Sequence, residues 1–287
     1  MPEGDTVWLT ARRLHDALAG REVTSCDLRV PTLATLDLRG EVLDEVLARG
    51  KHILMRLSSG RTLHSHLKMD GSWYITSTGR APRRHPAHLI RVVLGNQEWL
   101  ATGYRIHDLH LVATAEEGSL VGHLGPDLLG PDWDIDETLR RLASQSTSAV
   151  GDALLDQRNV AGIGNLYKCE VLFIERVNPW TPMGEVADPR RLIETARRLL
   201  LANRDHPEQS TTGLLGRDRS HWVYERAGQP CLRCRTRVRR DEQGMATQIR
   251  STYWCPRCQP GGAGAPGAAG PATTARESGT RAESPQR

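Results

Sequence analysis

The apolar residues at the start of the chain follow a helical spacing. Val7, Ala11, Leu14 and Leu18 lie three or four residues apart, and polar or charged residues fill most of the positions between them. Apolar residues at this interval form a stripe along one face of a helix. The pattern therefore predicts a helix over residues 5–19.

A strand-like pattern follows from about residue 21 to residue 115. Short apolar runs alternate with turns that contain Gly, Asp or Asn, which is typical of a β-sandwich or barrel. The predicted strands are Val42–Leu47, His52–Leu57, Thr62–Leu67, Trp73–Thr76, Leu89–Leu94, Gln97–Ala101 and Leu109–Ala113.

Helical spacing returns after a linker that contains Gly-Pro-Asp twice, at residues 125–127 and 130–132. The predicted helices are Thr138–Ser144, Val150–Leu155, Gly164–Arg176 and Pro189–Asn203. The final residues are mostly Gly, Ala, Pro, Ser and Thr, a composition that predicts disorder. The expected units are a β-sandwich with its leading helix (1–120), a helical domain (121–225), a cysteine module (226–260) and a disordered tail (261–287).

The composition is that of a soluble protein of 287 residues, with 38% hydrophobic and 25% charged residues. No apolar stretch approaches the roughly 20 residues that span a membrane, and no signal peptide precedes the first helix. We therefore expect a cytoplasmic protein without a membrane partner. The net charge of +4 is compatible with a polyanionic partner but does not identify one.

Four cysteines form two C-x2-C pairs separated by twenty residues: Cys231, Cys234, Cys255 and Cys258. Thiolates at this spacing suit a closed tetrahedral zinc site, which is structural rather than catalytic. The separation allows a β-hairpin, and its turn is predicted at residues 241–244. Two unrelated cysteine pairs and a redox motif are the weaker alternatives. Cys26 and Cys169 lie outside the module and are interpreted as ordinary semi-buried residues.

The same module is strongly basic. Between its first and last cysteine it contains seven arginines against two acidic residues. A basic hairpin stiffened by zinc is suited to a phosphate backbone, although a solvated charged surface is an alternative for many of these arginines. Arg250 differs because it leads into the second cysteine pair.

The N-terminus offers a different chemistry. If Met1 is removed, Pro2 carries a free secondary amine whose pKa lies near about 8, so a useful fraction is nucleophilic. Attack of such an amine on an aldehyde-level carbon gives an iminium ion that favours β-elimination. Glu3 is placed to move protons beside it. Met-Pro-Glu is nevertheless an ordinary way for a protein to begin.

A Gly-Ile-Gly-Asn segment at residues 162–165 joins two predicted helices. Gly162 and Gly164 would let backbone amides approach a phosphate at the start of the second helix. Asn165 could cap that helix or point outward. The alternative is an ordinary glycine turn between helices.

Together these motifs resemble the formamidopyrimidine-DNA glycosylase/endonuclease VIII family. The motifs are Pro2-Glu3-Gly4, Gly50-Lys51-His52, the segment 162–165 and the four-cysteine hairpin. The resemblance covers residues 2–260 and leans toward the endonuclease VIII branch. It implies a multidomain α+β fold with an N-terminal β-sandwich, a helix–two-turn–helix domain and a zinc-finger hairpin, with DNA in the cleft between the halves.

The resemblance also implies roles for individual residues. Pro2 would attack C1′ of a damaged nucleotide, and Glu3 would shuttle protons. Lys51 would contact a phosphate beside the lesion, while Asn165 and Arg250 would grip the phosphate that flanks the extruded nucleotide. A fork of guanidinium hydrogen bonds suits this last role.

Two further DNA-binding residues are less closely defined. Met69 is the candidate wedge that fills the gap left by the extruded base, and a methionine buried at a strand end is the alternative. Arg105 matches an arginine that relatives pair with an aromatic residue, but the aromatic partner is not matched. The chain also departs from many relatives after Gly4, where it has Asp5-Thr6 in place of Pro then Glu.

The implied activity is that of a monomeric, bifunctional DNA glycosylase and AP lyase of bacterial base excision repair. It would contain one structural Zn²⁺ and work at the nucleoid on damaged double-stranded DNA. It would remove oxidised bases, with pyrimidines favoured, through a proline Schiff base and nick the strand by β,δ-elimination. The alternatives are an AP lyase with little glycosylase activity and a non-catalytic zinc-finger DNA-binding protein.

Overall fold

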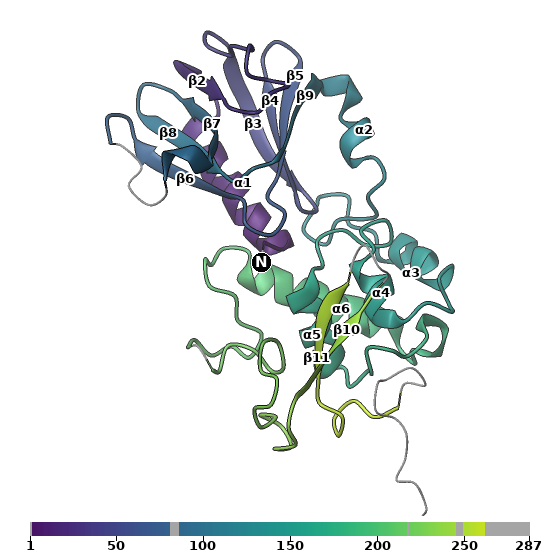
Figure 1. The fold of residues 1–287 in the computed structure, drawn as a ribbon. Helices are drawn as coiled ribbons and strands as arrows, with labels where there is room; N and C mark the ends of the chain where they lie inside the picture. The colour runs from purple at the N-terminus through teal and green to yellow at the C-terminus, as the bar shows by residue number, and fades with distance from the viewer. Residues whose placement is uncertain (1, 81–85, 217, 245–248, 262–287) are drawn as a thin grey trace, which may run out of the picture.

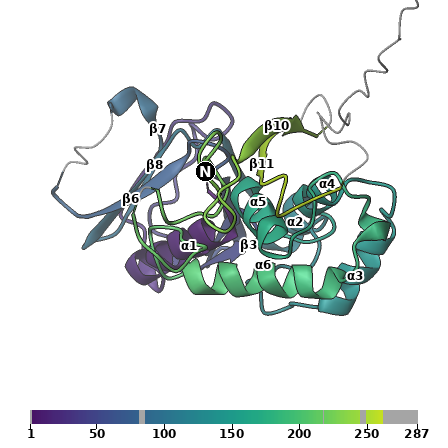
Figure 2. The same ribbon diagram turned by 90° about the horizontal axis from the view of Figure 1, so that it is seen from below.

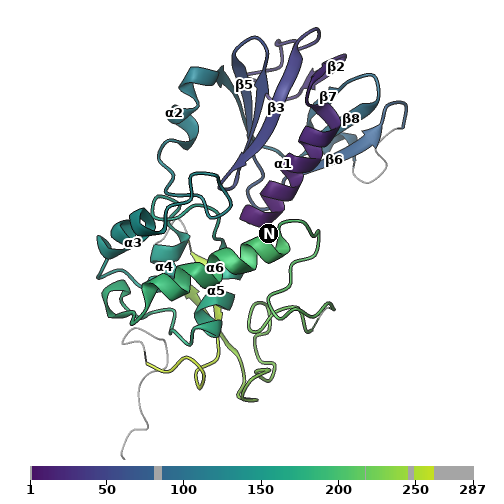
Figure 3. The ribbon, with the colours of Figure 1, turned by 180° about the vertical axis from the view of Figure 1, so that it is seen from behind.

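Two halves of the chain meet at the start of the first helix (Figure 1). The computed structural model describes residues 2–80, 86–216, 218–244 and 249–261. The predicted N-terminal helix is confirmed as α1 (Gly4–Leu18). It packs along β3, and the last long helix, α6, lies near its N-terminal end (Figure 3).

The N-terminal half is the predicted β-sandwich, built from two antiparallel sheets. One sheet has the order β1-β3-β4-β5-β9, and the other has the order β2-β7-β8-β6. The strands of the first sheet are β1 (Arg21–Glu22), β3 (Val42–Arg49), β4 (His52–Leu57), β5 (Arg61–His66) and β9 (Asp108–Ala113). Those of the second are β2 (Ser25–Leu28), β6 (Ser72–Ser77), β7 (Ile90–Gly95) and β8 (Trp99–Tyr104), with the 3-10 turn η1 (Ala87–Leu89) before β7.

Alternate residues of these strands fill one core between the sheets. Met55 of β4 and Leu63 of β5 pack there with Val92 of β7 and with Val7 and Leu14 of α1. The opposite face of the five-stranded sheet does not contribute to this cluster, and its side chains are largely polar. The sequence therefore places one face of each sheet in the core through the two-residue period of a strand.

The second half is helical and has its own core. It contains α3 (Ile135–Ala143), α4 (Val150–Leu155), α5 (Asn165–Ile174), η3 (Met183–Glu185) and α6 (Pro189–Asn203). The connection from the sandwich contains η2 (Thr114–Glu116) and α2 (Gly118–Val121), which lie beside the five-stranded sheet (Figure 1). Every residue of α5 from Asn165 to Phe173 is buried. This helix lies between α6 on one side and the hairpin on the other (Figure 2).

The hairpin consists of β10 (Arg239–Gln243) and β11 (Arg250–Trp254). The predicted turn at 241–244 is wrong at its start, because Asp241, Glu242 and Gln243 pair with residues of β11. The predicted disordered tail lies outside the described residues, apart from Gly261. Among the helices that the structure describes, none is long and apolar enough to cross a membrane.

Candidate active site

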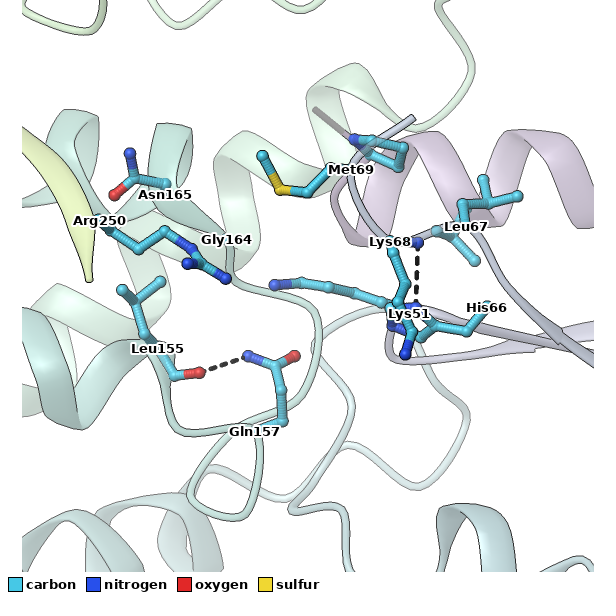
Figure 4. Close-up of a pocket in the computed structure, with 12 residues that line it drawn as sticks. Lys51, His66, Leu67, Lys68, Met69, Leu155, Gln157, Gly164, Asn165 and Arg250 are labelled. Carbon is cyan, nitrogen blue, oxygen red and sulfur yellow. Dashed lines mark hydrogen bonds between the residues drawn. The ribbon is translucent and has the colours of Figure 1, made fainter. Parts of the chain in front are cut away.

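A cleft of about 450 Å³ lies where the two halves meet (Figure 4). Both halves and the hairpin contribute to its walls. The lining residues are Pro2, Val7, Lys51, His66, Leu67, Lys68, Met69, Leu155, Gln157, Gly164, Asn165 and Arg250. Five of the candidates from the sequence therefore share one cavity: Pro2, Lys51, Met69, Asn165 and Arg250.

Glu3 lies buried beneath this cleft and caps a helix of the other half. Its carboxylate accepts hydrogen bonds from the backbone amides of Gly164 (2.8 Å), Leu166 (2.6 Å) and Tyr167 (3.3 Å). These amides begin α5, whose N-terminal partial positive charge favours an anion. The side chain therefore joins residues that are more than 160 positions apart in the sequence.

Burial still raises the pKa of Glu3 to about 7, although the nearby Lys51 and the amide hydrogen bonds act in the opposite direction. A carboxyl group with this pKa holds a proton in an appreciable fraction of molecules at neutral pH. It can therefore give or take a proton without a large change of pH. The structure thus makes Glu3 a competent acid or base as well as a cap.

Two glycines allow this close approach. A Cβ on Gly164 would lie 2.5 Å from the Glu3 carboxyl carbon, so a larger residue there would have to displace the Glu3 side chain. Gly4 donates its amide hydrogen to the Gly162 carbonyl at 2.9 Å, and a Cβ on Gly4 would lie 3.0 Å from the Gly162 Cα. The absence of a side chain at Gly4 and Gly164 therefore lets the two halves approach each other closely.

This arrangement corrects the expected use of the 162–165 segment. The amide of Gly164 binds Glu3, and that of Gly162 donates to the Gln157 side chain at 3.1 Å, so neither is directed at a phosphate. Gln157 also donates to the Ile163 carbonyl at 2.9 Å and lines the cleft. Gln157 was missed as a site residue, although it lies only 5 residues before Gly162 in the sequence.

Lys51 occupies the tight turn between β3 and β4. Gly50 begins that turn with φ +58°, and its amide donates to the buried Asp127 carboxylate at 2.7 Å. The Lys51 ammonium donates to the Ile163 carbonyl at 2.6 Å. Burial lowers the pKa of Lys51, and the positive charge of Arg250 adds to this effect, whereas Glu3 opposes it.

Asn165 and Arg250 lie on the opposite wall, where α5 meets β11. The Asn165 amide donates to the carbonyl of Ser251 at 2.7 Å, and its own buried Oδ1 has no hydrogen-bond partner within the described chain. Asn165 therefore does not cap α5, because Glu3 does. In Figure 4 the side chains of Arg250 and Lys51 point toward one another across the cleft.

Pro2 and Asp5 lie on either side of Glu3 and differ in exposure. Pro2 is half-buried and reaches the cleft. Asp5 is buried and does not line the cleft. Its carboxylate accepts hydrogen bonds from the Tyr167 hydroxyl at 2.6 Å and from the Gln209 side-chain amide at 2.9 Å. The position of Asp5 supports a structural contact between the halves.

Met69 lies in the loop between β5 and β6, at the rim of the cleft. Its side chain is 60% exposed, which excludes the alternative of a methionine buried at a strand end. Arg105 follows β8 with φ +52°, and its guanidinium lies 3.8 Å from the Asp70 carboxylate. Arg105 is thus adjacent to the Met69 loop but does not line the cleft.

The four cysteines converge at the base of the hairpin, and their sulfur atoms lie within 4.8 Å of one another. The separations are 4.0 Å between Cys231 and Cys258 and 3.4 Å between Cys234 and Cys255. Ligands at the usual Zn–S distance on a tetrahedral ion are roughly 3.8 Å apart. The cysteines are therefore positioned to bind one metal ion, and zinc fits the set.

Comparison with known domains gives matches over both halves. The formamidopyrimidine-DNA glycosylase N-terminal domain matches residues 1–107, and the H2TH domain of formamidopyrimidine-DNA glycosylase matches residues 124–204. Two solved complexes of Lactococcus lactis Fpg have the same fold. One contains N7-benzyl-Fapy-dG DNA (TM-score 0.73, 22% identity, 91% of this chain and 100% of that one), and the other contains abasic-site DNA (0.74, 22%, 90% and 99%).

Curated relatives are similar over nearly their whole length. "Probable endonuclease 8 2" of Streptomyces coelicolor is 55% identical over 93% of this chain and 97% of its own. "DNA-(apurinic or apyrimidinic site) lyase Nei2" of Mycolicibacterium smegmatis is 45% identical over 90% and 99%. "Formamidopyrimidine-DNA glycosylase" of Symbiobacterium thermophilum is 34% identical over 91% and 90%.

Proposed function

Because the chain belongs to the formamidopyrimidine-DNA glycosylase/endonuclease VIII family, we propose that it is a bifunctional DNA glycosylase and AP lyase of base excision repair. One observation carries the proposal. Pro2, Lys51, Asn165 and Arg250 come from four separate segments and line one cleft, with Glu3 buried beneath it. A DNA-binding protein without catalysis would have no need for this convergence around an N-terminal amine.

Pro2 is the proposed nucleophile, once Met1 has been removed. Its nitrogen forms a bond to C1′ of the damaged nucleotide while the bond from C1′ to the base breaks. After the sugar ring opens and the amine loses its proton, an iminium ion remains. Loss of a C2′ proton then expels the 3′ phosphate, and a second elimination expels the 5′ phosphate.

Glu3 is the proposed proton shuttle for these steps, and its pKa of about 7 supports that role. The departing base must be protonated only when a base is still present. Glu3→Gln should therefore reduce base removal more than nicking at a preformed abasic site. Single-turnover rates on the two substrates measure this difference, and equal losses would remove Glu3 from the base-departure step.

The cationic residues and the loop would position DNA. Lys51, Asn165 and Arg250 are proposed to hold backbone phosphates, with the Arg250 guanidinium as a bidentate donor. Met69 is the proposed wedge because it is exposed at the rim, and Arg105 would support the same loop through Asp70. Extrusion of a nucleotide costs a few kcal/mol, which such contacts offset.

The cysteine site is proposed to hold one structural Zn²⁺ that stiffens the hairpin and so fixes Arg250 against α5. Cys258→Ser should lose the metal and the hairpin's order, so DNA incision should collapse while the sandwich stays folded. Zinc content, activity and the circular dichroism of the β region test this together. Full activity in the metal-free protein would overturn the structural role.

A borohydride trap tests the nucleophile directly. Reduction of the iminium should link the protein covalently to abasic-site DNA, and peptide mapping should place the link at Pro2. Retention of Met1 converts the amine into an amide, so it should abolish the adduct while DNA binding persists; Pro2→Gly should weaken it. An adduct that maps to Lys51, or one that still forms when Met1 is retained, would make Lys51 the imine-forming residue instead.

A second candidate is an AP lyase with little glycosylase activity, because one close relative is named for its lyase activity alone. A panel of duplexes, each with one oxidised base or an abasic site, separates the two. We propose oxidised pyrimidines as the favoured substrates. We further propose that the protein acts as a monomer at the bacterial nucleoid in the cytoplasm, since its DNA substrate is there.

A further inference from the structure

A group of histidines lies on the polar outer face of the five-stranded sheet, and of these only His66 also lines the cleft. His64 of β5 is paired in register with His110 of β9, and His66 is paired with Asp108. On the other side, His52 of β4 pairs with His66. Strand register therefore places four imidazoles and one carboxylate on adjacent positions of one face.

Three of these residues bring potential metal-binding atoms together. One atom each of His64, Asp108 and His110 lies within 4.8 Å of the others. His110 Nε2 is 2.8 Å from Asp108 Oδ1, and the rings of His64 and His110 are stacked with centroids 5.7 Å apart. Small movements of exposed side chains would bring all three atoms into one coordination shell.

His64 provides an independent indication of a ligand. Its side chain is only 2% exposed, and its Nε2 is hydrogen-bonded to His52 Nδ1 at 2.8 Å. Its Nδ1 is buried without a hydrogen-bond partner within the described chain. A buried polar atom without a partner is costly, so a partner that the protein chain itself does not supply is expected there.

We propose that His64, Asp108 and His110 form a second metal site, which binds a divalent transition-metal ion such as Zn²⁺. Two imidazoles and one carboxylate match the ligand preference of zinc, with water completing a tetrahedral shell. Binding of the ion to His110 Nε2 would break the hydrogen bond between Nε2 and Asp108 Oδ1, and the neutral ring would then carry its hydrogen on Nδ1. With the ion on its Nδ1, His64 would donate its Nε2 hydrogen to His52 Nδ1, and this bond would orient His64 toward the ion.

The proposed site is also open to solvent on one side. His110 is 52% exposed, which leaves an entry path for the ion.

Lys68 connects this site to the cleft and competes with the ion. Its ammonium lies 3.0 Å from Asp108 Oδ2, and the same residue lines the cleft beside Met69. An ion bound by Asp108 would repel the Lys68 ammonium. Removal of that ammonium should therefore strengthen metal binding at this site. Nonspecific binding of the ion to a surface histidine would not respond to Lys68 in this way.

The test measures Zn²⁺ bound per chain in protein whose cysteine site is already loaded, by calorimetric titration and by metal analysis after desalting. Wild type should bind one more ion at micromolar concentration than His110→Ala or Asp108→Asn. Lys68→Ala should bind that ion several-fold more tightly. His206→Ala removes an exposed histidine after α6 and serves as the control, with unchanged binding.

Modification of histidines by diethyl pyrocarbonate tests whether the ion binds at His110. Zn²⁺ should protect His110, but not His206, from the reagent. Equal zinc uptake by all variants, an unprotected His110, or uptake only at millimolar concentration would each overturn the proposal. Zinc binding and protection from the reagent are both measured without DNA. Their result therefore does not depend on whether the protein is a glycosylase.

Discussion

At the scale of single residues, Glu3 should make the stability of the folded protein depend on pH. Burial raises its pKa from an ordinary value of 4.5 to about 7, so between these values the folded protein binds more protons than the unfolded chain. Its contribution to stability is therefore full below pH 4.5 and is lost as the pH rises through about 7. The shift corresponds to an upper limit of about 3 kcal/mol.

Glu3→Gln should remove this dependence, because an amide does not titrate in the range. Urea unfolding at pH 5 and pH 8 should show wild type losing more stability than the variant between the two values. Glu194→Gln changes an exposed glutamate of α6 and should behave as wild type. If Glu3→Gln keeps the wild-type slope, the carboxyl does not titrate with a raised pKa.

Arg250 and Arg237 allow a second comparison between single residues. Arg250 lines the cleft, whereas Arg237 is exposed and donates to the Gly228 carbonyl at 2.7 Å. Arg250→Ala should cost roughly 1–3 kcal/mol of affinity for abasic-site duplex, because a charge-assisted fork is lost. Arg237→Ala should cost less. Binding titrations at two salt concentrations measure both affinity losses. Similar small losses in the two variants would show that Arg250 is an ordinary surface charge.

At the scale of elements, the start of α5 depends on a carboxylate from the other half. Gly164→Ala places a methyl group 2.5 Å from the Glu3 carboxyl carbon and should displace it. The variant should melt at lower temperature and excise bases more slowly. Gly118→Ala adds a methyl group in open space in α2 and is the matched control. Normal excision by Gly164→Ala would show that Glu3 can act from another position.

The elements themselves were largely predictable, but their contacts were not. The periodicity of α1 and α6 and the apolar runs of β4 and β5 are local signals, and they gave bounds within a residue or so. The strands β1 and β2 were missed because they are only two and four residues long and mostly half-exposed. The register that gathers the histidines, and the cap on α5, arise from pairing between distant segments, which no local pattern contains.

The same distinction applies to the candidate site. Pro2, Lys51 and Arg250 could be proposed from motifs, because each stands in a short segment with a characteristic neighbour. Gln157 and Asp127 were missed, since their importance lies in hydrogen bonds to the backbone of Gly162 and Gly50. The sequence marks residues 125–127 as a turn, but it does not show that Asp127 accepts a hydrogen bond from the distant amide of Gly50.

At the scale of the whole molecule, the two halves keep separate apolar cores and are joined by buried polar contacts. The remaining segment, from Gly261 onward, has a composition unsuited to either core. A chain ending at Pro260 should therefore nick an abasic duplex at nearly the full-length rate. A large loss at moderate salt would show that arginines of this segment contribute to DNA binding.

The long-range cap on α5 also has a consequence for biosynthesis. Glu3 is among the first residues to leave the ribosome, yet the amides that hold it are translated more than 160 residues later. Arg250 emerges later still. A nascent chain that stops early therefore has the amine of Pro2 but neither the ordered acid nor the opposite wall of the cleft. Incomplete translation products should thus be unable to cut DNA, and cutting becomes possible only when synthesis is nearly finished.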